Sequence, residues 1–212
     1  MTMKIIYLIQ SETYNFSFSS ALKDTDCLLM IWGDDFNLPE DASHTTFHLP
    51  NSSWAQGRNE LYRRAQAMDD YDYFIFCDDD IEFNFELKEL HQLLSKYQPF
   101  RAVPDTSHTF YLHQPAKAKT LALKYVEHSV MALSAEAAQV LMPYSTEFDK
   151  TNWWLSSEEF CKRCWLQHPW QTQKFNTLNF KNTKSRSYPK NNYFGNPENE
   201  FKIVDLKEQD LD

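Results

Sequence analysis

The chain has 212 residues, of which 42% are hydrophobic and 16% aromatic, and this length suits a single domain with a substantial core. Its formal net charge of -9 argues against a nucleic-acid-binding protein, because the surfaces of such proteins are normally basic. Only three glycines are present, which excludes a glycine-rich phosphate loop of the Walker or dinucleotide-binding type.

The sequence contains no apolar run of about 18 residues, the length that spans a membrane. Its first ten residues form an apolar, strand-like run without a basic leader or a small-residue cleavage site. We therefore expect a cytoplasmic protein with no transmembrane segment, and we leave peripheral contact with a membrane open.

The N-terminal half reads as alternating strands and helices. Apolar runs predict strands at residues 4–9, 27–32 and 45–49. A short helix is expected at 16–23, and a longer one follows the third strand, where Leu61, Ala65 and Met68 recur at helical spacing. Strands joined by connections this short predict a parallel α/β sheet.

Three consecutive aspartates follow the strongest predicted strand. Residues 73–77 are all apolar or aromatic, as in a strand buried on both faces, and Asp78, Asp79 and Asp80 come directly after them. Open α/β sheets hold their ligands at the carboxyl ends of the strands. Crowded carboxylates repel one another unless a cation relieves the repulsion, and Mg²⁺ and Mn²⁺ prefer oxygen ligands such as carboxylates and substrate phosphates. This pattern predicts a metal and phosphate site; the alternative is a solvated acidic turn that precedes a helix.

The helix before that strand begins with Ser52-Ser53 as caps and carries Gly57, Arg58 and Asn59. A guanidinium near a diphosphate makes bidentate, charge-assisted hydrogen bonds, which would give Arg58 a ligand-binding role. The alternative is that the arginines of this helix only cover its surface.

The C-terminal half continues the α/β pattern. Apolar periodicity predicts a helix at 87–97 and a second helix that begins with Ser134 as its N-cap and ends at Met142. It also predicts strands at 100–104, 109–113, 125–133 and 172–180 and a helix that closes at His168. Ser156 and Glu159 are spaced as a capping box at the start of that last helix. Residues 181–199 are rich in Asn, Lys, Ser and Pro. We expect one catalytic domain at 1–180 and a flexible polar segment at 181–212.

The four cysteines are expected to be thiols, since the predicted compartment is reducing. Cys161, Cys164 and His168 fall on one helical face and suggest zinc as an alternative, but a second ligand pair is missing.

The triple aspartate after a buried strand, the Gly57-Arg58-Asn59 segment before it and the later Ser-Glu-Glu run resemble the GT-A fold nucleotide-sugar-dependent glycosyltransferases, which carry an Asp-x-Asp motif. The resemblance implies a GT-A-like, Rossmann-like α/β fold with a mixed, mainly parallel sheet flanked by helices. It also implies transfer of a sugar from a nucleoside-diphosphate donor, which we expect to be UDP-linked, to a hydroxyl of a glycan or lipid-linked acceptor. Mn²⁺ or Mg²⁺ would be the cofactor.

On the donor side, the resemblance assigns metal binding to Asp80. Asp78 would ligate the metal through water or face the ribose, and Asp79 could take either part. A late histidine, His168 or His128, would add a metal ligand. The remaining donor-site residues that the resemblance implies are Ile9, Gln10 and Ser11 near the base and Arg58 and Asn59 near the nucleotide.

On the acceptor side, the resemblance assigns the catalytic base of an inverting enzyme to Glu158 or Glu159. Glu158 is favoured, because Glu159 has the capping role available.

Two other functions are compatible with parts of the pattern. A haloacid-dehalogenase-type phosphohydrolase also has Asp-x-Asp after a strand, but it needs Thr or Val where Glu82 stands and places the motif near the N-terminus. The other is a non-catalytic GT-A-like binding module.

Overall fold

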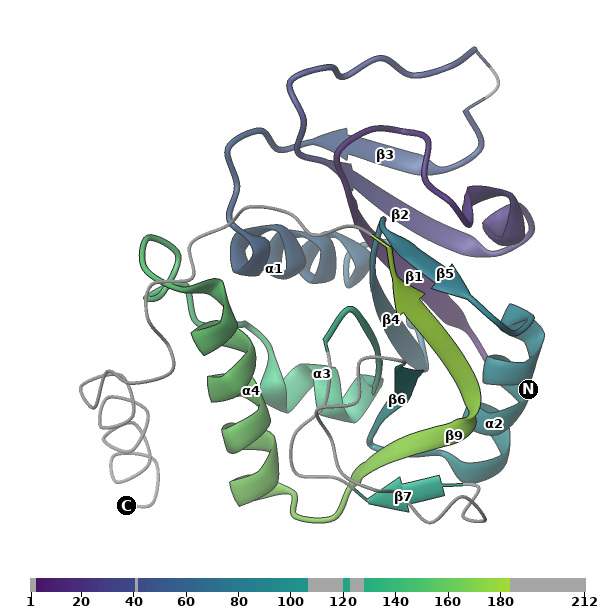
Figure 1. Cartoon of the computed structure of the whole chain (residues 1–212), viewed down its shortest axis with the longest axis vertical. Helices are drawn as coiled ribbons and strands as arrows, with labels where there is room; N and C mark the ends of the chain where they lie inside the picture. Colours follow the sequence, from purple (N-terminus) through teal and green to yellow (C-terminus); the bar gives the residue numbers. More distant parts are fainter. Residues whose placement is uncertain (1–2, 41, 107–119, 123–127, 184–212) are drawn as a thin grey trace.

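The computed structural model describes residues 3–40, 42–106, 120–122 and 128–183. Within these residues the chain forms a nine-stranded mixed sheet in the order β3-β2-β1-β4-β8-β6-β9-β5, with β7 paired to β9 (Figure 1). The strand predicted at 109–113 and almost all of the predicted flexible segment at 181–212 lie outside the described residues. No helix in the described part of the chain is long and apolar enough to cross a membrane.

The N-terminal half of the sheet is parallel. Its strands are β1 (Ile5–Ser11), β2 (Asp26–Ile31), β3 (Thr45–His48) and β4 (Tyr73–Asp78). All seven residues of β1 are buried, because the strand lies between β2 and β4 and both of its faces are covered. This burial explains the continuous apolar runs of the sequence.

The C-terminal half mixes strand directions. It comprises β8 (Val130–Ser134), β6 (Arg101–Thr106), β9 (Thr172–Asn182), β5 (Ile81–Phe83) and β7 (Thr120–Ala122). β8 runs antiparallel to both β4 and β6, whereas β9 runs parallel to β6 and continues to pair with β5. β9 therefore extends two residues past the predicted domain boundary at 180 and returns the chain to the end of β4.

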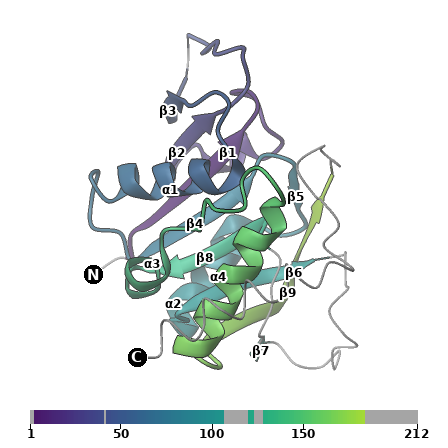
Figure 2. The same cartoon turned by 90° about the vertical axis from the view of Figure 1, so that its left-hand side faces the viewer.

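Helices cover both faces of the sheet. They are α1 (Trp54–Ala65), α2 (Leu87–Tyr97), α3 (Ala135–Leu141), α4 (Trp153–Gln167) and the 3₁₀ turn η1 (Ser19–Leu22). Helices α1, α3 and α4 lie on one face of the sheet and α2 lies on the other (Figure 2). Buried side chains of α1, α3 and α4 belong to one core cluster, and those of α2 and η1 belong to a second. The predicted fold class is confirmed: the chain is a mixed α/β protein with a helix-flanked sheet.

Helix α4 begins one turn earlier than predicted. Its N-cap is Asn152, whose Oδ1 accepts a hydrogen bond from Trp154 N at 3.0 Å. Ser156 Oγ instead donates to Ser145 O at 2.8 Å, so the predicted capping box of Ser156 and Glu159 is wrong. By contrast, Ser134 caps α3 as predicted, accepting from Ala137 N at 3.1 Å.

Candidate functional site at the carboxyl end of β4

The aspartate run lies where β4 leaves the sheet. Asp78 is the last residue of β4 and is paired with Gln10 of β1, and Asp79 and Asp80 form the turn into β5. Asp79 and Asp80 are each only 5% exposed. The end of β9 also reaches this turn, because Thr183 N and Thr183 Oγ1 both donate to Asp80 O, at 2.8 and 2.9 Å. Three segments of the chain therefore meet at the predicted metal site.

Asp78 forms an ion pair with a buried arginine. Arg58 Nη2 donates to Asp78 Oδ1 at 2.8 Å and to His128 O at 2.9 Å. The side chain of Arg58 is 1% exposed, and its Cζ lies 4.3 Å from the centroid of the Trp54 ring. Trp54 Nε1 also approaches Asp78 Oδ1, at 3.4 Å. Arg58 is thus a buried bridge between β4 and the start of β8, and it is not placed to contact a diphosphate as predicted.

Gly57, the residue before Arg58, lies against side chains of β1 and β2. A Cβ at Gly57 would lie 2.3 Å from Gln10 Nε2 and 2.8 Å from Met30 Cε, so a larger residue would require the ends of these two side chains to move. The sequence resemblance drew attention to Gly57-Arg58-Asn59, but the close approach of helix and strand that gives the glycine its role is visible only in three dimensions.

Asp79 holds two turns together. Its Oδ2 accepts from Glu12 N at 3.1 Å and lies 3.1 Å from Ser11 Oγ. Ser11 Oγ also lies 2.6 Å from Thr13 O. The carboxylate of Asp79 therefore fixes the end of β1 to the end of β4, which is a structural role rather than the predicted contact with the donor.

Of the other predicted base contacts, Ile9 is fully buried in the core cluster that contains α2, so only its main chain could contact a ligand. Gln10 is 7% exposed and lies against Gly57.

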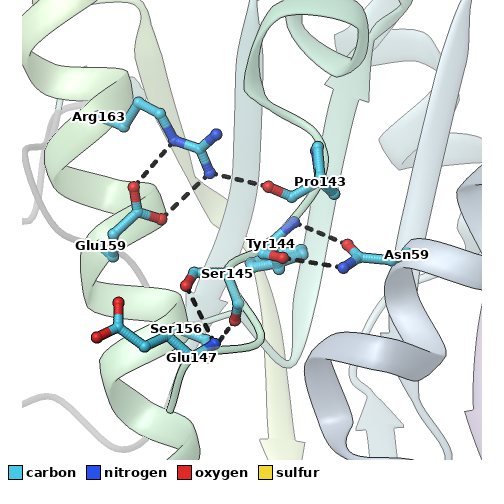
Figure 3. Close-up of polar contacts among 8 residues, drawn as sticks. All are labelled: Asn59, Pro143, Tyr144, Ser145, Glu147, Ser156, Glu159 and Arg163. Carbon is cyan, nitrogen blue, oxygen red and sulfur yellow. Dashed lines mark hydrogen bonds and ion pairs between the residues drawn. The ribbon is translucent and has the colours of Figure 1, made fainter. Parts of the chain in front are cut away.

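The Asn59 amide clamps a distant loop. Its Nδ2 donates to Tyr144 O at 2.9 Å, and its Oδ1 accepts from Tyr144 N at 2.7 Å (Figure 3). Both ends of the amide are thus used on main chain between α3 and α4. The prediction that Asn59 contacts the nucleotide is not supported by this placement.

The two glutamates of α4 have different surroundings. Glu159 forms an ion pair with Arg163, with Glu159 Oε1 3.2 Å from Arg163 Nε, and Arg163 Nη2 also donates to Pro143 O at 3.0 Å (Figure 3). Glu159 is therefore tied to its own helix and to the loop before it. Glu158 is half-buried at the preceding position of the same helix.

Asp149 has a buried carboxylate, which no sequence pattern predicted. It lies in the loop before α4, where Trp153 Nε1 donates to Asp149 O at 2.8 Å. Both of its carboxylate oxygens are buried, and neither has a well-formed hydrogen bond to the described residues. Burial raises the pKa of the Asp149 carboxyl, and the nearby hydroxyl of Ser53, the N-cap of α1, opposes part of that effect. Asp149 thus lies near the N-terminus of α1, beside Ser53, and the next residue, Trp54, approaches Asp78.

The predicted histidine ligands are elsewhere. The His168 ring stacks on Phe100 with 4.3 Å between centroids. Phe100 O accepts from Ser134 N, and Ser134 pairs with Tyr73 at the start of β4, so His168 is at the opposite end of β4 from the aspartates. The prediction of His168 as a ligand beside Asp78 and Asp80 is therefore wrong.

His128 is not available to a metal either. Its ring nitrogens lie 2.8 Å from Tyr144 Oη and 3.0 Å from Cys161 Sγ. Within the described ranges, no group of three or more His, Cys, Asp or Glu side chains is arranged to hold a metal, which also removes the zinc alternative for those residues.

The donor set at the end of β4 nevertheless suits a hard cation. Mg²⁺ and Mn²⁺ bind oxygen, and Mg²⁺ in particular is commonly held by one or two carboxylates together with substrate phosphates. The carboxylates of Asp78 and Asp80 supply that kind of partial site. A diphosphate would have to contribute the remaining ligands.

No protein-family model matches the sequence, and no curated protein matches it significantly. The structure is similar to S. aureus TarS in complex with UDP-GlcNAc, with a TM-score of 0.67 and 13% identity over 96% of this chain and 65% of that chain. GalNAc-T7 with UDP, GalNAc and Mn²⁺ gives a TM-score of 0.62 and 11% identity over 97% of this chain and 48% of that one. A197 from STIV gives 0.53 and 11%, covering 84% of each chain.

The chain thus spans less than two thirds of the length of the TarS and GalNAc-T7 chains that it resembles. Identities of 11–13% carry the fold and not the activity. The chain has the mixed α/β fold of GT-A glycosyltransferase structures.

Proposed function

We propose that this protein is a glycosyltransferase that moves a sugar from a UDP-linked donor to a hydroxyl of a glycan or lipid-linked acceptor, with Mn²⁺ or Mg²⁺ as cofactor. The observation that carries the proposal is the position of Asp78 and Asp80 at the carboxyl end of β4, beside the end of β1. Ligands of open α/β sheets bind outside such strand ends. The similar structures of TarS and GalNAc-T7 were obtained with UDP-GlcNAc and with UDP, GalNAc and Mn²⁺, respectively, which supports this choice of donor and cofactor.

On the donor side, Asp80 and Asp78 would hold the cation together with the diphosphate. A bound cation supplies positive charge where negative charge develops on the departing diphosphate. Arg58 acts indirectly, because its guanidinium fixes the Asp78 carboxylate from below while remaining buried. Gln10, Ser11 and the main chain of Ile9 would border the base at the end of β1.

On the acceptor side, Glu158 would take the proton of the acceptor hydroxyl as its oxygen attacks the sugar, the usual task of a general base. Glu159 is the weaker candidate, since its carboxylate already pairs with Arg163. The phosphohydrolase alternative gains no support, because Glu82 is an exposed residue of strand β5.

The proposal is tested by thermal unfolding with UDP, with and without Mn²⁺. A ligand present at 100 times its Kd stabilises the folded state by about 2.7 kcal/mol, which raises Tm by roughly 5–11 °C for a domain of this size. We expect that rise only with UDP and Mn²⁺ together. Failure of every nucleoside diphosphate to shift Tm would contradict the proposal. Binding without hydrolysis of UDP-sugars or transfer to any acceptor would favour the non-catalytic binding module. The acceptor class and the cytoplasmic location stay predictions.

A further inference from the structure

A second arginine is buried in the core, and no carboxylate of the described residues forms an ion pair with it. Arg101, the first residue of β6, is fully buried. Its Nε donates to Thr172 Oγ1 at 2.9 Å, its Nη1 lies 3.7 Å from Cys161 Sγ, and its Nη2 has no hydrogen-bond partner in the described part of the chain. None of the ion pairs among the described residues includes Arg101. A guanidinium stays protonated in proteins, so its positive charge requires a counter-charge nearby.

His128, which also contacts Cys161, is uncharged in the folded protein. Burial and the positive charges of Arg101 and Arg58 hold the pKa of His128 well below its usual range, so the imidazole is neutral. The Tyr144 hydroxyl lies 2.8 Å from His128 Nδ1 but 3.9 Å from Met131 Sδ, so its single proton is best donated to the imidazole. The imidazole proton is then on Nε2, which points at Cys161 Sγ 3.0 Å away.

Two N–H groups therefore converge on one sulfur. Cys161 is 2% exposed on α4, and both His128 Nε2 and Arg101 Nη1 approach its Sγ from the sheet. A thiol is a weak acceptor, whereas a thiolate is stabilised by neighbouring guanidinium and imidazole donors. Thr172 Oγ1, which accepts from Arg101 Nε, also lies 3.6 Å from Cys164 Sγ, and both of these groups are uncharged side chains of the described residues.

We propose that Cys161 is a thiolate in the folded protein and that this thiolate is the counter-ion of the buried Arg101. Its proton is released to solvent on folding, and no oxidant or reductant is involved. Because Cys161 projects from α4 and Arg101 from β6, the pair fixes that helix against the sheet. Cys161 lies two and three residues after Glu159 and Glu158, so it is a positioning residue for the acceptor side. This last consequence, unlike the ion pair itself, rests on the proposed function.

The other three cysteines lack the pair of N–H donors that approaches Cys161 in the described part of the chain and serve as comparisons for it. Burial raises the pKa of Cys27 to about 12 and raises that of Cys77 well above its usual range, so both are protonated at neutral pH. Cys164 lies one turn from Cys161 and is equally buried, but Thr172 is its hydrogen-bonding neighbour. Cys164→Ser is therefore the matched control for Cys161→Ser.

Thiolate absorbance in the ultraviolet tests the inference without any donor or acceptor. We expect the native wild-type protein and Cys164→Ser to show a single thiolate at neutral pH, and Cys161→Ser to show none. Unfolding at the same pH should abolish the signal, because a free cysteine has a pKa of about 8.5. The stability advantage of wild type over Cys161→Ser should also grow as pH rises toward that value, since the unfolded chain then binds more protons than the folded one.

Absence of thiolate absorbance from the native wild-type protein at neutral pH would overturn the inference, even if Cys161→Ser failed to fold. Retention of the signal in folded Cys161→Ser would also overturn it. Loss of sugar transfer alone would bear on the proposed function and not on this ion pair. If transfer is established, Cys161→Ser should lower kcat more than it raises the donor KM, because α4 carries the acceptor-side glutamates.

Discussion

Arg58→Met should destabilise the protein by about 3 kcal/mol. Arg58 is 1% exposed, and its Nη2 pairs with Asp78 Oδ1 at 2.8 Å and with His128 O at 2.9 Å. Removing one partner of a buried ion pair costs about 3–5 kcal/mol, because the other charge is left uncompensated. The Asp78 side chain is 20% exposed and can be partly hydrated, so the low end of that range applies. In a domain of this size the loss corresponds to a Tm lower by roughly 6–12 °C.

Urea unfolding of four proteins measures this effect: wild type, Arg58→Met, Asp78→Asn and the double variant. The double variant should be less destabilised than the sum of the single changes, because no charge is left unpaired. Arg63→Met is the matched control on the same helix, since the Arg63 side chain is 67% exposed and forms an ion pair with Glu60. That change should cost less than about 1 kcal/mol. If Arg58→Met costs no more than Arg63→Met, or if the single effects add, Arg58 is not a buried bridge.

Three further outcomes follow from the site. Asp80→Ala should remove the Mn²⁺-dependent part of UDP binding with little loss of stability, because Thr183 is held by the Asp80 carbonyl; calorimetry showing undiminished metal-dependent affinity would exclude Asp80 as a ligand. Glu158→Gln should slow transfer by at least about 100-fold whereas Glu159→Gln should not, and wild-type rates in both variants would remove both as the base. Asp149→Asn should weaken the pH dependence of urea unfolding. The raised pKa of Asp149 means that the folded carboxyl keeps its proton longer than the unfolded one, so its contribution is lost as pH rises through the folded pKa. An unchanged pH profile would show that Asp149 is solvated.

The sequence predicted those features that depend on local pattern. The apolar runs of β1 and β4 arise because both strands are covered on two faces, and an acidic run that follows such a strand must lie beyond its carboxyl end. Glycosyltransferase-like order along the chain then predicted the fold class. The three-residue strands β5 and β7 were missed, because their pairing with β9 is set by distant residues rather than by their own composition.

Roles within the site depended on long-range contacts that the sequence does not show. Asn152 outcompetes Ser156 as the cap of α4, which moves the helix start by one turn and frees Glu159 to pair with Arg163. His168 is separated from the aspartates by the length of β4. Its position in the sequence, at the end of a late helix, does not reveal at which end of the sheet that helix ends. Arg58 is buried where α1 packs on the sheet, and no spacing rule predicts that depth.

The Asn59 clamp makes the two halves of the fold mechanically interdependent. Asn59 and Tyr144 are 85 residues apart, yet the Asn59 side-chain amide makes hydrogen bonds to both the N–H and the C=O of Tyr144, as a paired strand would. A shift of the loop before α4 must therefore be transmitted to α1, which carries Arg58 and Trp54 beneath Asp78. A chimera that joined this N-terminal half to the C-terminal half of another protein would need a backbone at the Tyr144 position that fits this amide. Without that match, each half could keep its own strands and still fail to hold the other in register.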